Sequence, residues 1–234
     1  MTHPLLLLPG LVCDRFIWAA QARALASEFD VRATPDFYDF DSIPAMAQSV
    51  LASAPSKFHL AGHSMGGRVA FEIARRAPER VASLIMLSTG ADPLQPGESE
   101  RRHALVAIAD ARGMEALASA WLPATVAPAR LSDAPFMAAL TQMVCRATPA
   151  IFARQIGALI HRPDARPLLP EIACPTLVMA GREDGYSPLA NHRDIAAAIP
   201  GAELCAVEGA GHMLPVEAPD AVAAALRAWL APRG

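Results

Sequence analysis

One serine lies in a setting that strongly suggests chemistry. Residues 62–67 read Gly-His-Ser-Met-Gly-Gly, a Gly-x-Ser-x-Gly pattern that follows an apolar segment and opens an amphipathic one. A serine at a tight strand-to-helix turn has a strained backbone, and side chains two residues away on either side would collide there. Gly62 and Gly66 avoid that collision and lift the hydroxyl of Ser64 clear of the backbone. The context predicts a nucleophile; an incidental serine in a glycine-rich connector is the alternative.

A nucleophilic serine needs a histidine base, which a carboxylate must orient. Asp184 closely follows the apolar run 176–180, so it is expected at the carboxyl end of a parallel strand, with Glu183 as the neighbouring alternative. Of the seven histidines, only His192 and His212 come after this acid in the chain. We predict His212 as the base because it lies in a flexible Gly-Ala-Gly-His turn. His192 falls inside a helical pattern, where a solvent-exposed position is expected.

Acyl transfer also requires two N–H donors directed at the oxygen that becomes negative. The first is predicted to be the amide of Met65, because a helix that begins here has free N–H groups at its start. The second is expected from residues 8–12, Leu-Pro-Gly-Leu-Val, which follow the first apolar run. Leu11 is the predicted donor, and a plain turn is the alternative for this loop.

The elements that must position these residues follow from the hydrophobic pattern. Short apolar runs alternate with longer segments of helical periodicity, which predicts an α/β fold with a parallel sheet covered on both faces. In the helix after Ser64, Arg68, Glu72 and Arg76 form an i,i+4 ladder on a face separate from the apolar stripe. The predicted strands are residues 4–8, 29–33, 58–61, 81–87, 176–180 and 204–207.

Strand patterns disappear between about residues 91 and 170, and helical patterns punctuated by proline take their place. We therefore predict a helical cap, 91–170, inserted into a catalytic core made of residues 1–90 and 171–234. The helices expected in the cap are residues 103–112, 114–121, 135–146 and 151–161.

Several side chains of this insertion could form a substrate cleft between cap and sheet. Trp121, Phe136 and Phe152 are the predicted apolar lining, with ordinary packing inside the cap as the alternative. Arg154 and Gln155, in the middle of a cap helix, could bind a substrate carboxylate through a forked hydrogen bond; an exposed arginine at the surface is the alternative.

Composition excludes several classes of protein. The chain has 234 residues, of which 53% are hydrophobic and 18% charged, with a net charge of −3. No basic run suggests nucleic-acid binding, and no apolar run reaches the ~18 residues of a membrane span. The four cysteines form no Cys-x-x-Cys pair, so we expect thiols in a reducing cytoplasm and no metal site.

Together, three segments resemble the α/β-hydrolase superfamily, in the branch of small lidded enzymes that includes carboxylesterases, pimeloyl-carrier-protein methyl ester esterases and enol-lactonases. They are residues 62–67, the Cys-Pro-Thr-Leu-Val of 174–178 leading into Gly-Arg-Glu-Asp, and Gly-His at 211–212 followed by Glu-Ala-Pro. The resemblance implies a mostly parallel, eight-stranded sheet flanked by helices, a helical cap, a serine-histidine-aspartate triad and no cofactor. One departure is Pro9-Gly10, where the family usually has His-Gly.

The expected function is that of a serine hydrolase that cleaves a small or medium carboxylic ester through an acyl-enzyme. Its partner would be a small-molecule ester, and the protein would be a monomer or a homodimer. The alternatives are lactonase or lyase chemistry with the same triad, as in the menaquinone-pathway relatives, and a ligand-binding protein without useful catalysis.

Overall fold

The sheet positions every candidate site residue. The computed structural model describes residues 3–34 and 36–231, and within them six parallel strands form one sheet in the order β2-β1-β3-β4-β5-β6. The α/β-hydrolase fold is confirmed, but the expectation of eight strands is wrong for these residues. The sequence offers six apolar runs of strand type, and each forms one strand. The strands are β1 (Leu5–Leu8), β2 (Val31–Ala33), β3 (Phe58–His63), β4 (Val81–Leu87), β5 (Thr176–Gly181) and β6 (Glu203–Val207).

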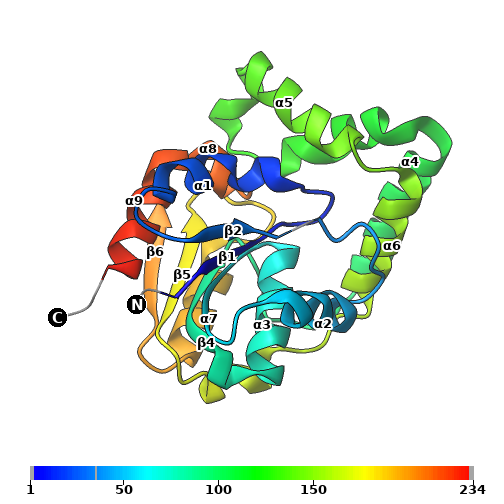
Figure 1. The fold of residues 1–234 in the computed structure, drawn as a ribbon. Helices are drawn as coiled ribbons and strands as arrows, with labels where there is room; N and C mark the ends of the chain where they lie inside the picture. Colours follow the sequence, from blue (N-terminus) through cyan, green and yellow to red (C-terminus); the bar gives the residue numbers. More distant parts are fainter. Residues whose placement is uncertain (1–2, 35, 232–234) are drawn as a thin grey trace.

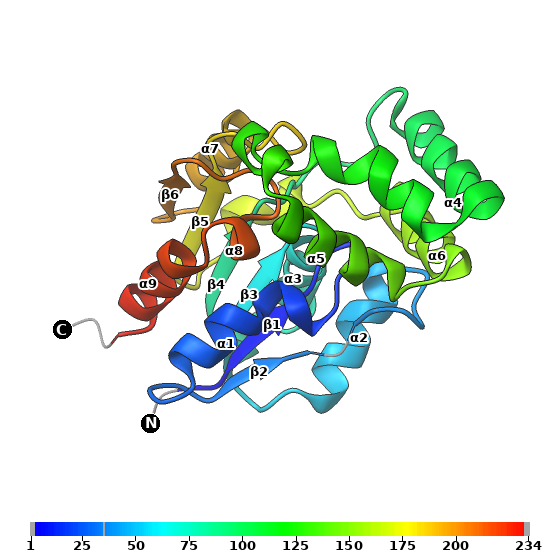
Figure 2. The ribbon, with the colours of Figure 1, turned by 90° about the horizontal axis from the view of Figure 1, so that it is seen from above.

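Helices cover both faces of this sheet, as its apolar composition requires. The four leucines of β1 are all buried, so neither face of that strand can meet water. Figure 2 shows α1 and α9 on one face and α2, α3 and α7 on the other. These helices are α1 (Ala19–Leu25), α2 (Ile43–Ser53), α3 (Met65–Arg76), α7 (Leu189–Ala198) and α9 (Pro219–Leu230), with the short α8 (Leu214–Glu217) before the last.

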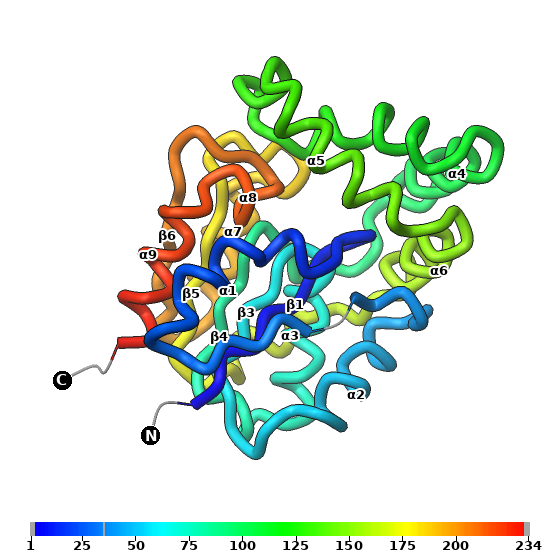
Figure 3. Tube along the Cα trace, turned by 45° about the horizontal axis from the view of Figure 1, so that its top comes forward, coloured from blue at the N-terminus to red at the C-terminus, as the bar shows by residue number. Residues whose placement is uncertain are grey.

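Between β4 and β5 the chain leaves the sheet and forms a separate group of helices, seen in green tones in Figures 1 and 3. These are α4 (Glu98–Trp121), α5 (Ala134–Cys145) and α6 (Pro149–Ile160). Two helices were expected where α4 runs; their predicted boundary, Gly113, is the point at which α4 is kinked, with φ 82° and ψ 176°. The division into a core and a cap at residues 91 and 170 stays a prediction.

Short 3-10 helices connect the larger elements. They are η1 (Arg15–Trp18), η2 (Pro78–Arg80), η3 (Leu122–Ala124), η4 (Pro128–Ser132) and η5 (Arg166–Glu171). Within the described ranges no single helix is long and apolar enough to span a membrane; α5 and α6 meet that test only as a pair bent by 87°.

Two glycines allow α3 to pack directly against the sheet. A Cβ atom at Gly62 would lie 2.4 Å from the carbonyl oxygen of Gly66, and one at Gly66 would lie 2.5 Å from the carbonyl oxygen of Leu8. Both distances are much shorter than a van der Waals contact. In both cases the atom in the way belongs to the backbone and cannot rotate aside as a side chain could. The steric requirement predicted for these glycines is therefore confirmed.

Replacing Gly66 with alanine should destabilise the protein, because β1 or α3 must shift to admit the methyl group. Overpacking of this kind costs about 1–3 kcal/mol, equivalent to a fall in Tm of roughly 2–4 °C per kcal/mol at this chain length. Gly157→Ala is the matched control: Gly157 lies in α6 with nothing within 4 Å of its Cβ position, so alanine should be neutral or stabilising. Thermal unfolding of both variants tests this, and equal Tm values would contradict it.

Candidate active site

Ser64 lies between β3 and α3 in a backbone conformation that few residues adopt. Its φ is 53° and its ψ is −115°, and such strain persists only where the surroundings enforce it. The surroundings here are hydrogen bonds: the amide of Ser64 donates to the carbonyl of Leu87 at 2.9 Å, and the Thr89 hydroxyl donates to the carbonyl of Ser64 at 2.8 Å. The serine is thus held by β4 and the loop that follows it.

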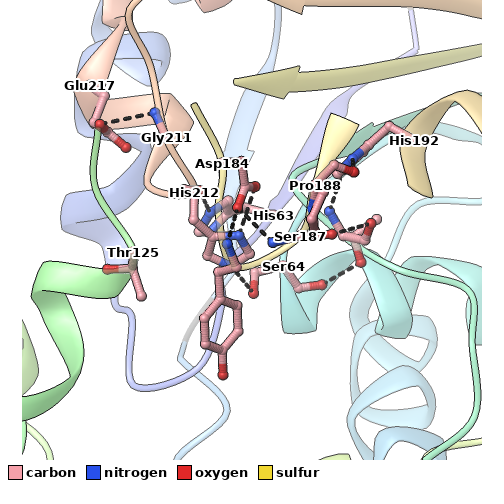
Figure 4. Close-up of polar contacts among 12 residues, drawn as sticks. His63, Ser64, Thr125, Asp184, Ser187, Pro188, His192, Gly211, His212 and Glu217 are labelled. Carbon is pink, nitrogen blue, oxygen red and sulfur yellow. Dashed lines mark hydrogen bonds and ion pairs between the residues drawn. The ribbon is translucent and has the colours of Figure 1, made fainter. Parts of the chain in front are cut away.

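The structure brings Ser64, His212 and Asp184 together in one hydrogen-bonded chain (Figure 4). The Nε2 atom of His212 lies 2.9 Å from the Ser64 hydroxyl oxygen, and its Nδ1 atom lies 2.9 Å from the Oδ2 atom of Asp184. The imidazole and the carboxylate are both buried. Glu183, the alternative acid, is exposed. This is the geometry in which an imidazole can accept the serine proton while the carboxylate holds the ring.

Asp184 is held ionised by its contacts. Burial alone would raise the pKa of this carboxyl, but the charge and hydrogen bond of His212, together with the backbone amide of Ser187, outweigh it and lower the pKa. The Oδ1 atom accepts the amides of Tyr186 at 2.9 Å and Ser187 at 2.7 Å. One carboxylate oxygen therefore closes the turn after β5, and the other remains free for the histidine.

The loop that carries His212 is held by the segment after α4. The carbonyl of Thr125 accepts the backbone amides of His212 at 3.0 Å and Met213 at 3.1 Å. The carboxylate of Glu217 accepts the amides of Ala127 at 2.7 Å and Gly211 at 3.0 Å, although burial raises its pKa. Glu217 belongs to the Glu-Ala-Pro segment noted in the sequence, and the structure gives it a role in positioning the imidazole.

The loop after β1 passes directly over Ser64. A Cβ atom at Gly10 would lie 2.9 Å from the Nδ1 atom of His63 and 3.3 Å from the Cβ atom of Ser64. Leu11 and Met65, the predicted oxyanion donors, both line the cavity at Ser64. Their role in binding an oxyanion stays a prediction.

A side chain from α6 supports this loop, and sequence reasoning did not identify it in that role. Val12 has a φ of 45°, which is strained for a β-branched residue. Its amide donates to the Oε1 atom of the fully buried Gln155 at 2.8 Å. The sequence analysis considered Gln155 only as a contact for a substrate carboxylate; its polar side chain in the middle of a cap helix was the one signal for this contact.

Two more histidines support the site from within the core. His192, expected to be exposed, is fully buried, and its Nε2 atom accepts the backbone amide of Thr89 at 2.9 Å. The prediction failed because helical spacing does not show that this face of α7 packs against the loop after β4. The Nε2 atom of His63 lies 2.8 Å from the carbonyl oxygen of His212, and burial, reinforced by His212, lowers the pKa of His63 to about 3. Both imidazoles are uncharged and contact the backbone of the neighbouring loops.

A cavity of about 530 Å³ opens at Ser64 and His212. Trp121 lines it, as expected, but the other three predicted substrate residues do not. Phe152 is fully buried in the cap core, 6.5 Å from the Trp121 ring, and Phe136 packs under the guanidinium of Arg130. Arg154 is directed away and donates to the carbonyl of Tyr38 at 2.9 Å. The helical pattern showed that these side chains were apolar or cationic, but not which way their helices face.

A parallel sheet, a strained serine at a strand-to-helix turn and a buried histidine-aspartate pair define a hydrolase of the α/β class. Comparison of the sequence with family models agrees, since residues 5–225 match the alpha/beta hydrolase family. The chain belongs to this family and is therefore assigned as a hydrolase. A putative carbamate hydrolase, RutD, of Rhizobium rhizogenes is 29% identical to this chain. The alignment covers 92% of this chain and 88% of the length of RutD.

Solved structures show the same relationship. A thermophilic esterase from Thermogutta terrifontis, solved with malate bound, is 31% identical and superposes with a TM-score of 0.87 over 97% of this chain and 89% of that one. The enol-lactonase from Burkholderia xenovorans is 25% identical, with a TM-score of 0.88 over 99% of this chain and 92% of that one. This chain is similar to enzymes named for different substrates, so the family alone does not select one.

The buried neutral state of His63 predicts how stability varies with pH. An unfolded histidine takes up a proton below about pH 6.5, whereas folded His63 does so only near pH 3. The free energy of unfolding should therefore fall as the pH drops through this range, by up to about 1.4 kcal/mol per pH unit for this group. In His63→Asn that contribution disappears, so its stability should fall less steeply between pH 6 and pH 4. Urea unfolding at several pH values measures the slopes, and parallel curves would refute the assignment.

Proposed function

We propose that this protein is a serine hydrolase that cleaves a carboxylic ester through an acyl-enzyme intermediate. The observation that carries the proposal is the pair of 2.9 Å contacts that join Ser64 to His212 and His212 to Asp184. The similarity to an esterase with 31% identity supports the same reaction class.

In the first half of the reaction, the Ser64 oxygen attacks the ester carbonyl carbon while His212 takes the hydroxyl proton. Asp184, which its contacts with His212 and the Ser187 amide keep ionised, orients the ring and stabilises the imidazolium that forms. The negative charge that develops on the carbonyl oxygen is received by the amides of Met65 and Leu11. His212 then returns the proton to the departing alcohol, which leaves an acyl group on Ser64.

In the second half, a water molecule takes the place of the alcohol. His212 removes a proton from this water as it attacks the acyl carbon, and the same two amides stabilise the second oxyanion. The proton returns to Ser64, and the carboxylic acid leaves. The overall change is one ester bond and one water consumed, with one alcohol and one acid released.

We further propose a cytoplasmic location and a small or medium ester as the substrate. All four cysteines are free thiols in the structure, which supports the prediction of a reducing cytoplasm. The cavity volume lies within the range of sites for small molecules, which supports a small or medium ester.

Ser64→Ala should lower kcat/KM for the best ester by at least ~10⁴-fold, because no other group can form the acyl-enzyme. A fluorophosphonate probe should label the wild-type protein and not this variant. Ser119→Ala, which changes an exposed serine in α4, is the matched control and should label normally.

A panel of p-nitrophenyl esters and carbamates, read for a pre-steady-state burst, separates ester from carbamate cleavage.

An absence of both labelling and burst in the folded protein would contradict the acyl-enzyme. Weak turnover of p-nitrophenyl esters together with no burst would favour the lyase chemistry considered from the sequence. Loss of less than tenfold in Ser64→Ala would leave the serine without its proposed role.

A further inference from the structure

The cavity beside Ser64 has a strongly asymmetric charge. Four arginines line it, against two carboxylates, Asp92 and Glu98. Two positive charges are therefore in excess at the site of a chain whose net charge is −3. We refer to the four residues as the arginine cluster: Arg68 from α3, Arg101 and Arg102 from α4, and Arg162, which follows α6.

The two carboxylates do not neutralise this cluster. Glu98 pairs with Arg102 at 2.8 Å and with Arg162 at 2.7 Å, so one acid serves two guanidinium groups. Arg68 donates to the backbone carbonyl of Asp92 at 2.7 Å, and no ion pair to Arg68 is found among the described residues. Burial is the main cause that lowers the pKa of Arg68 to about 9, and the charges of Arg162 and Arg102 lower it further, against the opposing effect of Glu98 and Asp92.

Several hydrogen-bond donors of the cavity lining also lack acceptors. Within the described part of the chain, the Nη1 atom of Arg102, the Nε1 atom of Trp121 and the hydroxyl of Ser88 are buried without a partner. The arginine and tryptophan groups can only donate. A buried donor without an acceptor is costly, so native proteins rarely keep several in one cavity unless a ligand completes them. This wall of the cavity is therefore short of hydrogen-bond acceptors.

The spacing along α3 sets the distance between the cluster and the reacting carbon. Arg68 comes four residues after Ser64, about one helical turn, or a rise of roughly 6 Å. Both residues line the same cavity, so an anion held by Arg68 would share that cavity with a carbonyl group attacked by Ser64. Planar guanidinium groups match carboxylates and phosphates through paired N–H···O bonds, so the anion is expected to be an oxyanion of this kind.

We propose that the arginine cluster is a subsite for a substrate carboxylate, so that the substrate is an ester bearing a free carboxylate a few bonds from the scissile carbonyl. Arg68 and Arg102 bind the carboxylate oxygens, Arg101 lies at the exposed rim, and Arg162 holds Glu98 and the loop after β4. The proposal rests on the proposed ester hydrolysis for its catalytic part. The sequence analysis assigned such a contact to Arg154, which the structure directs elsewhere.

The kinetic test compares two esters of equal size, the monomethyl ester of glutaric acid and its terminal carboxamide. The wild-type protein should hydrolyse the carboxylate ester with a kcat/KM at least tenfold higher, mainly through a lower KM. In Arg68→Met this preference should fall to threefold or less, whereas Arg68→Lys should retain part of it. Arg112→Met, an exposed arginine of α4 outside the cavity lining, is the control and should keep the full preference.

Arg68 also holds the carbonyl of Asp92, so a second variant is needed whose side chain has no such structural contact. Arg101→Met changes an exposed side chain, and a smaller but clear loss of preference is expected there. Binding is measured separately from catalysis by titrating glutarate into Ser64→Ala in a calorimeter. Glutarate should bind, and adding Arg68→Met should weaken binding at least tenfold. Inorganic phosphate should bind more weakly than glutarate.

The outcomes distinguish the two proposals. Equal turnover of the carboxylate and carboxamide esters would overturn the subsite and leave the esterase proposal standing. Arg68-dependent glutarate binding without turnover of either ester would support the subsite and count against ester hydrolysis. Phosphate binding tighter than glutarate would overturn the carboxylate assignment in favour of a phosphorylated ligand.

Discussion

The contact on which the site depends is the close approach of the first turn of α3 to the ends of β1 and β3. Gly66 lies against the carbonyl of Leu8, and Gly62 lies against the carbonyl of Gly66, at separations that leave no room for a side chain. Because the helix begins so close to the sheet, the chain must reverse within one residue, and Ser64 takes the strain with its φ of 53°. Its hydroxyl therefore projects from the sheet edge beside the amides of a helix start, where an anion is favoured.

Five neighbouring strands each deliver one part of the site at this edge. The non-glycine residues of positive φ in the described ranges, Val12, Ser64 and Ser88, follow β1, β3 and β4, which are adjacent in the sheet. Asp184 follows β5 and His212 follows β6. Strain at one edge is tolerable because neighbouring loops hold one another through hydrogen bonds, so the sheet order, and not chain proximity, assembles the site.

The helices between β4 and β5 contribute to the site's geometry as well as to its cavity. Gln155 accepts the amide of the strained Val12, and the Thr125 carbonyl accepts the amides of His212 and Met213. The loop over the serine and the loop of the histidine are thus both held from outside the sheet. The pKa values of His63 and His192 are lowered, so these two imidazoles add no charge near the site, and the arginine cluster lines the cavity.

The sequence by itself determined the local features: six strands, the glycines at the serine turn, the residues of the triad and the break at Gly113. These follow from periodicity, from sterics within a few residues and from the order of residues along the chain. The expectation of eight strands came from the family resemblance and not from these patterns. The sequence did not determine the burial of His192, nor that Arg68 rather than Arg154 lies at the cavity. Those outcomes depend on how one helix faces another, and a pattern of apolar and charged positions shows the faces of a helix without showing what packs against them. Only the tertiary structure brings residues more than a hundred positions apart, such as Ser64 and His212, to one edge of the sheet, where their chemistry can be judged.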